Sequence, residues 1–251
     1  MEALGVHFEV NRTAGKDFTV DSLFADGCDA VFIGSGTAVA KELDLPGKEL
    51  DGIIQSSYLL RMIALYNSHQ LDRREVPVEN GDRAVVIGCG NVAMDAARSL
   101  LRMGAASVQV IYRGKQETMP ALKAEYEGAV TDGATFLWEH TPVAYEGETR
   151  VTGLRVTTPD GERSIAADKV YLAVGSRPAN RIVSSTEGIE VDGNGYVITR
   201  ERPYGMTTRQ GVFAGGDVMH RPATVVLAMK EAKLVAEGIA AYVDAVRLLE
   251  L

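Results

Sequence analysis

Two glycines and an alanine in the segment AVVIGCGNVA have the spacing that a dinucleotide-binding turn requires. Gly88, Gly90 and Ala93 form the pattern GxGxxA directly after a β-branched apolar run and at the start of an amphipathic one. In such a turn the first glycine permits the tight bend, the second lets the backbone approach a pyrophosphate, and the third small residue lets helix and strand pack closely. The free N–H groups of a helix beginning at Asn91 would then face the phosphates.

The charged residues after the next apolar run indicate which dinucleotide the turn accepts. An NAD-specific site has an acidic residue about 20 residues further on, at the end of the second strand. This sequence has Tyr112-Arg113-Gly114-Lys115 there. Arg113 could grip a 2′-phosphate with two hydrogen bonds, and Lys115 could add a looser point charge. The pattern favours NADP over NAD, although the same residues also suit an ordinary surface turn.

Three other segments consist of an apolar strand that runs into glycine, which is typical of buried strands that end where a ligand approaches. They are residues 30–36, 170–176 and 211–217, and Gly175 closes the second of them. The first contains Gly34 and Gly36, but Pro46-Gly47 follows too soon for a full crossover helix. We therefore do not expect a second nucleotide fingerprint there.

The last of these strands delivers Gly216 and Asp217 to the start of a helix. The aspartate could accept hydrogen bonds from a ribose or polyol hydroxyl, and the helix amino terminus could stabilise negative charge on a flavin ring. Alternatively, Asp217 simply caps a turn. The chemistry of the residues alone leaves both interpretations open.

The composition excludes several classes of function. The chain has 251 residues and a net charge of −8, and without a basic cluster we expect no nucleic-acid partner. It has no apolar stretch of membrane-spanning length and no signal-like start, so we expect no membrane association and a cytoplasmic location. Cys28 and Cys89 are far apart in sequence and cannot form a redox pair or hold a cluster, so we expect both to be buried small hydrophobes.

Periodicity predicts the elements that must position these residues. Residues 84–113 read as strand, helix and strand, and a second helix is expected over 121–133. Short strands around 135–138, 143–146, 151–158 and 163–166 should form a hairpin or meander that closes a small nucleotide domain. A long helix is expected from Thr224 to Leu251, packed under the last strand. Its expected apolar side comprises Val225, Val226, Leu227, Met229, Ala232, Leu234, Val235, Ile239 and Tyr242.

Four motifs occur in order along the chain: GCGNVAMDAAR, VIYRGKQETMPA, VYLAVGSRPAN and GVFAGGDVMHRPATVVLAMKEAKLVAEGIAAYV. Together they closely resemble the pyridine-nucleotide and flavin half of the glutamate synthase small subunit family, and the similarity extends over nearly the whole chain. The same module is similar to part of dihydropyrimidine dehydrogenase. The resemblance implies an α/β fold with a Rossmann-like NAD(P)-binding domain inserted into a partial FAD-binding domain, of the flavoprotein type with two dinucleotide-binding domains. It also implies hydride transfer from NADPH to FAD.

The resemblance implies two sets of cofactor contacts. The residues expected at NADP are Gly88, Gly90, Asn91, Val92, Ala93, Arg113, Lys115 and Gly175. The residues expected at FAD are Gly216, Asp217, Ala223, Thr224 and Val225. Because the cofactors carry the chemistry, we expect no catalytic side chain and no metal. His220 could titrate near neutrality, but we interpret it as structural or solvated.

The family's strand–GxGxxG–helix for the ADP half of FAD has no counterpart in this sequence. We therefore expect residues 1–53 and 178–251 to be two segments of a partial FAD-binding domain, around an NADP-binding domain at 54–177. The FAD site would be incomplete unless another polypeptide supplies that unit. The expected partner is an iron–sulfur or flavin-bearing subunit or domain that accepts electrons, and apolar surface at the unfilled site could favour a homo-oligomer.

Two other functions are compatible with the sequence. The chain could be a non-catalytic nucleotide-binding or electron-transfer fragment that needs a partner chain to complete the FAD site. It could also be an NADP-dependent dehydrogenase without flavin, but residues 211–217 would then have no role. Flavin absorbance that co-purifies with the chain would favour a reductase over a non-catalytic fragment.

Overall fold

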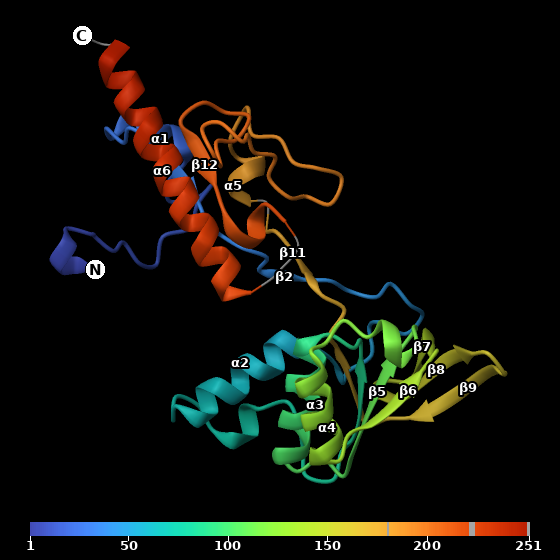
Figure 1. The fold of residues 1–251 in the computed structure, drawn as a ribbon. Helices are drawn as coiled ribbons and strands as arrows, with labels where there is room; N and C mark the ends of the chain where they lie inside the picture. Colours follow the sequence, from blue (N-terminus) through green and yellow to red (C-terminus); the bar gives the residue numbers. More distant parts are fainter. Residues whose placement is uncertain (180, 221–223, 250–251) are drawn as a thin grey trace. The chain divides into compact units, whose positions relative to one another are not determined.

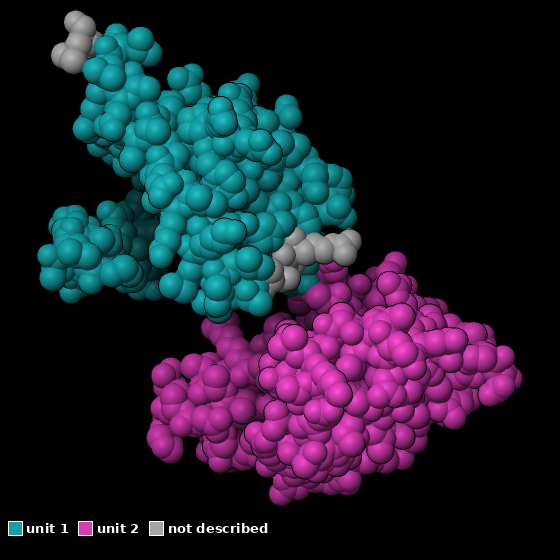
Figure 2. All heavy atoms as spheres, viewed as in Figure 1, with its two compact units in different colours: residues 1–39, 176–251 teal, residues 40–175 magenta. Residues whose placement is uncertain are grey.

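The computed structural model describes residues 1–179, 181–220 and 224–249. The chain divides into two compact units, which Figure 1 shows as a ribbon and Figure 2 as filled space. Unit 1 combines the two ends of the chain, residues 1–39 and 176–251, and unit 2 comprises residues 40–175. The two ends of the chain therefore share one unit, and the middle forms the other.

Unit 2 is built on a five-stranded sheet with the strand order β3-β10-β4-β5-β6. Every neighbouring pair is parallel, so the carboxyl ends of all five strands meet at one edge. Parallel neighbours need long crossover connections, and helices supply them after β3, β4 and β5. The elements are β3 (Ile53–Gln55), α2 (Ser56–Asn67), β4 (Arg83–Ile87), α3 (Asn91–Arg102), β5 (Ser107–Tyr112), α4 (Lys123–Asp132), β6 (Thr135–Trp138) and β10 (Lys169–Leu172).

The helices α2, α3 and α4 cover one face of this sheet (Figure 1). The side of α3 that faces the sheet carries small residues, Ala93, Ala96 and Ala97, which are fully buried and let the helix approach closely. Met94 and Leu100 fill the remaining space and are also fully buried. Burial of each large side chain of this kind contributes about 1.5–3 kcal/mol, so the helix is held mainly by packing.

A three-stranded antiparallel sheet, in the order β7-β8-β9, packs against the other face. Its strands are β7 (Thr141–Gly147), β8 (Val151–Thr158) and β9 (Gly161–Ala166). Leu154 and Val156 of β8 are fully buried against Val85 and Ile87 of β4. The predicted meander is confirmed for these strands. Residues 135–138 were wrongly placed in it, because β6 follows the crossover helix α4 and pairs in parallel with β5.

Unit 1 has a smaller framework, in which β1 (Val31–Ile33) pairs in parallel with β12 (Val212–Ala214). No helix directly follows β1, in agreement with the expectation that Gly34 and Gly36 are not a nucleotide fingerprint. Instead, β2 (Val39–Ala40) pairs with β11 (Ser176–Arg177). The helices of this unit are α1 (Val20–Ala25), α5 (Arg181–Ser184) and α6 (Val225–Leu249), with 3-10 turns at Glu2–Leu4 and Gly216–Val218. Two further 3-10 turns, Arg73–Glu75 and Gln116–Thr118, belong to unit 2.

The unit bounds differ from those expected, because residues 40–53 belong to unit 2. Leu43, Leu45 and Leu50 pack into the core between the two sheets of that unit. The strand β3 then pairs with β10 immediately afterwards. The second bound lies at 175/176 instead of 177/178. Long-range packing of three leucines, which have no helical or strand period, could not be read from the sequence.

Two expectations about burial were wrong. Cys28 is exposed, and only Cys89 is a buried thiol. On α6, most of the expected apolar side is not covered by the described residues: Val235 is 1% exposed, whereas Val225 is 76% exposed. Tyr242 packs on Phe213 of β12, with ring centroids 5.7 Å apart. The helix therefore packs near the last strand only through its middle turns.

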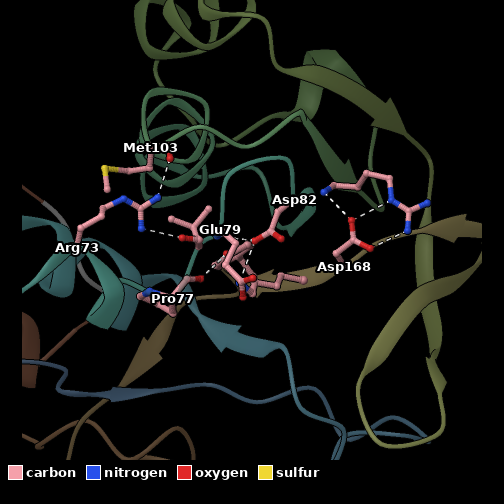
Figure 3. Close-up of polar contacts among 10 residues, drawn as sticks. Arg73, Pro77, Glu79, Asp82, Met103 and Asp168 are labelled. Carbon is pink, nitrogen blue, oxygen red and sulfur yellow. Dashed lines mark hydrogen bonds and ion pairs between the residues drawn. The ribbon is translucent and has the colours of Figure 1, made fainter.

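The amino-terminal edge of the parallel sheet carries a network of ion pairs (Figure 3). The buried ammonium of Lys169, at the start of β10, lies 2.9 Å from an Asp82 carboxylate oxygen and 3.0 Å from one of Glu79. Arg83 and Asp168 form a two-bond pair beside it. Hydrogen bonds from Arg83 lower the pKa of Asp168 to about 2. This network ties the loop before β4 to the bottom of the sheet.

A hollow of about 470 Å³ lies along this edge, between residues 73–80 and Lys169. Arg73 in its wall donates hydrogen bonds to the carbonyl oxygens of Val78 and Met103. Because Arg73 and Lys169 both have protein partners, the hollow is a junction between the loop and the sheet and has no free cation from these two residues for a ligand.

We expect Lys169→Met to lower the free energy of unfolding by about 3 kcal/mol, because it leaves the mostly buried Asp82 carboxylate without its cation. Urea unfolding at neutral pH measures this loss. Arg83→Met is the matched control, since its pair with Asp168 is half exposed and should be worth at most about 1 kcal/mol. Equal losses for the two variants would contradict a buried anchoring role for Lys169.

Candidate functional site

The opposite, carboxyl-terminal edge of the parallel sheet holds the GxGxxA turn. The N–H group of Gly88 donates a hydrogen bond to Ile111 of the neighbouring strand, at 3.0 Å. Its φ angle of 118° is unfavourable for any residue with a side chain, and a Cβ atom there would clash with the carbonyl oxygen of Ala173. Gly88 is therefore required by the fold itself, which brings β4, β5 and β10 together at this point.

Gly90 is different, because nothing in the protein requires it to be glycine. Its φ angle is −88°, which any residue can adopt, and beyond its two chain neighbours no described atom lies within 4 Å of the place where its Cβ would stand. Gly90 is the N-cap residue of α3, so the space lies beside the first free N–H groups of that helix. Ala93 is fully buried and Val92 is exposed. The open space is suited to an anion such as a pyrophosphate.

Two hydrogen bonds join the segment 119–122 to the GxGxxA turn. The carbonyl oxygen of Cys89 accepts from the N–H of Ala121 at 3.1 Å. The side-chain oxygen of Asn91 accepts from the N–H of Leu122 at 2.9 Å. Asn91 was predicted from the sequence as a cofactor contact, and the structure shows that its amide oxygen positions a neighbouring loop. Burial raises the pKa of the Cys89 thiol to about 11, so it is not a thiolate near neutral pH.

Arg113 and Lys115 follow the carboxyl end of β5, and both are exposed. The turn that carries them is ordered by three hydrogen bonds: Tyr112 Oη to the Thr118 carbonyl, Thr118 Oγ1 to the Lys115 carbonyl, and Gln116 Nε2 to Tyr126 Oη. Lys115 Nζ lies 3.9 Å from a carboxylate oxygen of Glu139. Two cations are thus presented to solvent on a fixed turn, at the sheet edge that carries the glycine turn.

Four aromatic residues support this turn. Phe136 and Trp138 of β6 stack with ring centroids 5.5 Å apart. Tyr126 of α4 meets Phe136 edge-on at 4.7 Å, and Tyr112 meets Trp138 edge-on at 6.3 Å. Each such pair adds about 0.5–1.5 kcal/mol beyond the area it buries. Trp138 is the single tryptophan of the chain, so its fluorescence reports on this region.

Gly175 lies past the end of β10, at the last residue of unit 2. Its φ angle is 91°, and its carbonyl oxygen accepts a hydrogen bond from the N–H of Lys41 at 2.9 Å. Beyond its two chain neighbours, no described atom lies within 4 Å of its ideal Cβ position. The left-handed backbone explains the glycine without a ligand.

In unit 1, Gly216 and Asp217 form a 3-10 turn after β12. Glu231 of α6, which the sequence did not single out, holds this turn. Its carboxylate accepts from the N–H of Gly216 at 2.9 Å and pairs with Nε2 of His220 at 2.8 Å. His220 is therefore tied to a structural carboxylate, in line with its interpretation as a structural residue.

The remaining residues expected at the flavin lie at the start of α6. Thr224 accepts a hydrogen bond from the N–H of Leu227 through its Oγ1 at 3.3 Å and so caps the helix. Val225 is exposed. Ala223 lies outside the described residues. The structure thus links Gly216 and His220 through Glu231, and it places Thr224 directly before the helix that supplies this carboxylate.

The described residues meet neither the requirements of a metal site nor those of a membrane-spanning helix. Among residues 1–179, 181–220 and 224–249, no group of three or more His, Cys, Asp and Glu side chains could hold a metal ion. None of the helices described there is long and apolar enough to cross a membrane.

Residues 5–232 match the family described as pyridine nucleotide-disulphide oxidoreductase. The chain is 34% identical to the glutamate synthase (NADPH) small chain of Halomonas elongata, over 97% of this chain and 56% of that protein. It is 30% identical to the protein of the same name from Escherichia coli, over 96% and 56%. It is 33% identical to the NADP(+)-dependent formate dehydrogenase subunit beta of Moorella thermoacetica, over 96% and 35%. The chain spans about half the length of the small chains.

Two solved structures share the fold. FprA from Mycobacterium tuberculosis matches with a TM-score of 0.75 at 17% identity, over 94% of this chain and 68% of that one. Thioredoxin reductase from T. acidophilum matches with a TM-score of 0.69 at 23% identity, over 86% and 66%. At these identities the likeness concerns the fold alone. It confirms the predicted class, an α/β fold of the type with two dinucleotide-binding domains.

The contrast between the two glycines yields a test of the site. We expect Gly90→Ala to lower the free energy of unfolding by no more than about 1 kcal/mol, and to weaken NADPH binding at least about tenfold because the methyl group occupies the open space. Gly88→Ala should instead destabilise the fold by about 2 kcal/mol or more. Urea unfolding gives the stabilities, and energy transfer from Trp138 to the nicotinamide gives the affinity. Unchanged NADPH affinity in Gly90→Ala would show that the phosphates of NADPH do not bind at this turn.

Proposed function

The chain belongs to the pyridine nucleotide-disulphide oxidoreductase family, and on that premise we propose that it takes part in hydride transfer from NADPH to FAD. Unit 2 binds NADPH at the carboxyl edge of its parallel sheet. Unit 1 contributes Gly216, Asp217 and the start of α6 to an FAD site. When bound, the nicotinamide supplies a hydride and the flavin accepts it, so the residues of the chain bind and orient the cofactors.

The open space over Gly90 is the observation that carries this proposal. The neighbouring residues of the motif are explained without a ligand: Gly88 by its backbone conformation and Ala93 by its burial. Gly90 has no such internal reason. A glycine kept free beside the amino terminus of a 12-residue helix leaves room for a pyrophosphate to reach backbone N–H groups.

The choice of NADPH over NADH rests on Arg113 and Lys115. Both side chains are exposed at the end of β5, the strand next to β4 in the sheet. An adenosine ribose on a Rossmann-like domain lies near the end of this second strand. Arg113 can make a bidentate contact with a 2′-phosphate, and Lys115 can contribute a second positive charge.

On the flavin side, the turn at Gly216 and Asp217 is fixed by Glu231. Asp217 is half-buried and is suited to accept a hydrogen bond from a ribityl or ribose hydroxyl. Exposed apolar side chains lie on the same unit, among them Phe32, Val225 and Met229. We propose that they contact FAD and polypeptide outside residues 1–251 that binds its adenosine half.

The electron acceptor is a partner subunit or domain that carries iron–sulfur clusters or flavin. This part of the proposal is supported by the names of the relatives, which describe a small chain and a subunit of larger enzymes. The alternative of a purely non-catalytic binding fragment is not favoured, because the relatives are named as oxidoreductases or their chains. The family match equally argues against a dehydrogenase that works without flavin.

A calorimetric titration of the chain with NADPH, NADH and FAD tests the proposal. We expect NADPH to bind with a stoichiometry of about one per unit 2 and more tightly than NADH. FAD should bind more weakly than NADPH unless the completing polypeptide is present. Failure of NADPH to bind would contradict the proposal. Tight stoichiometric FAD binding by this chain alone would show that the flavin site needs no further polypeptide.

Arg113→Ala separates the two nicotinamide cofactors. Loss of a charge-assisted grip on the 2′-phosphate should weaken NADPH binding by about 1.5–3 kcal/mol and leave NADH nearly unchanged. Arg74→Ala is a matched control, because it also removes an exposed arginine from unit 2, but near the other edge of the sheet. Equal losses for NADPH and NADH would exclude Arg113 as the 2′-phosphate contact.

A further inference from the structure

The backbone places a carboxylate directly beside the two cations of the turn after β5. Glu139 follows β6, the neighbour of β5 in the sheet. Its N–H group donates a hydrogen bond to the carbonyl oxygen of Gly114 at 3.0 Å, and the N–H group of His140 donates to Tyr112 at 3.0 Å. These two bonds flank the peptide of Arg113. Glu139 is therefore part of the same structure as the predicted 2′-phosphate site, although 24 or more positions separate them in sequence.

The position of Glu139 is unusual for its residue type. Its φ angle is 58°, in the left-handed region where non-glycine residues other than Asn and Asp are uncommon. The corner is held firmly: Nδ1 of His140 bonds the Trp138 carbonyl oxygen at 2.6 Å, and Arg163 bonds Nε2 of the same ring at 2.6 Å. A glycine or asparagine would suit the backbone better, so the backbone does not explain why a glutamate is present.

The Glu139 carboxylate forms an ion pair with Lys115. Glu139 Oε1 lies 3.9 Å from Lys115 Nζ, and the two side chains are 44% and 67% exposed. At this distance and exposure the pair is loose, worth about 0.2–1 kcal/mol, and its partner can be exchanged. A 2′-phosphate bound to Arg113 would compete with Glu139 for the same ammonium group. It would also be repelled by the carboxylate, which a cofactor without that phosphate would not be.

From this geometry we infer that Glu139 is a specificity-determining residue, which limits the preference for NADPH over NADH by competing with the 2′-phosphate for Lys115. The inference rests on the proposed NADPH site and refines it. Specificity is a difference between two affinities, and a repulsive group can set its size. The carboxylate beside the cationic turn thus lowers the affinity for NADPH more than the affinity for NADH.

The test is a titration of Glu139→Gln with NADPH and with NADH, followed by energy transfer from Trp138. Glutamine keeps the size and the backbone tendency of glutamate and removes the charge. We expect the variant to bind NADPH about two- to fivefold more tightly than the unaltered chain, which corresponds to the loss of one exposed ion pair. NADH affinity should change less than about 1.5-fold, and the gain for NADPH should shrink as salt is added.

Glu117→Gln is the matched control, because it removes a carboxylate from the same turn outside the pair of Lys115 and Glu139. It should give a smaller gain than Glu139→Gln. In a Lys115→Met background, Glu139→Gln should raise NADPH affinity by a smaller factor than in the unaltered chain, since the competition for Lys115 no longer exists and only the direct repulsion of the phosphate remains.

Two results would overturn the inference while leaving the NADPH site intact: unchanged NADPH affinity in Glu139→Gln, or an equal gain for NADPH and NADH. An undiminished gain in the Lys115→Met background would equally overturn the competition for Lys115. If the unaltered chain does not bind NADPH at all, the proposed function fails together with this inference, and the titration of that chain distinguishes the two cases.

Discussion

The parallel pairing of β4 with β5 on one side and β10 on the other is the constraint on which the proposed nucleotide site depends. At the carboxyl ends of these strands, Gly88 donates to Ile111 and Ala173 donates to Ile87. The backbones approach so closely that a side chain at Gly88 has no room. This contact forces the chain to turn sharply and start α3 at once. The helix amino terminus and the open space over Gly90 follow from that turn.

The two edges of the same sheet are stabilised in different ways. The amino-terminal edge is sealed by ion pairs, with a buried Lys169 between Glu79 and Asp82. The carboxyl-terminal edge presents the amino terminus of α3 and the exposed cations Arg113 and Lys115, and Lys115 lies 3.9 Å from the carboxylate of Glu139. Ion pairs at one edge tie the loop before β4 to the sheet, and the helix amino terminus and cations at the other edge suit the anionic ligand proposed there.

In unit 1 a glycine turn also follows a buried strand, but a carboxylate from a helix holds it in place. Its strand β12 also ends in glycine, but the turn that follows is held by the carboxylate of Glu231 from α6. A helix that packs against β12 through Val235 and Tyr242 thereby fixes the loop at Gly216 as well. The exposed apolar residues at the amino-terminal end of this helix are consistent with a unit that receives further apolar contacts from a cofactor or from polypeptide.

The sequence by itself determined the GxGxxA turn, the helix behind it, the cations after β5 and the order of the elements, because each depends on the types and spacing of residues close together in the chain. Tertiary structure decided which glycine is confined and which is free, that Asn91 holds Leu122, and that Glu231 anchors Gly216. It also exposed Cys28 and Val225, which local hydrophobicity alone had assigned to buried positions. These features are contacts between separate strands, helices and loops, and a contact of that kind leaves no periodic signal in either segment.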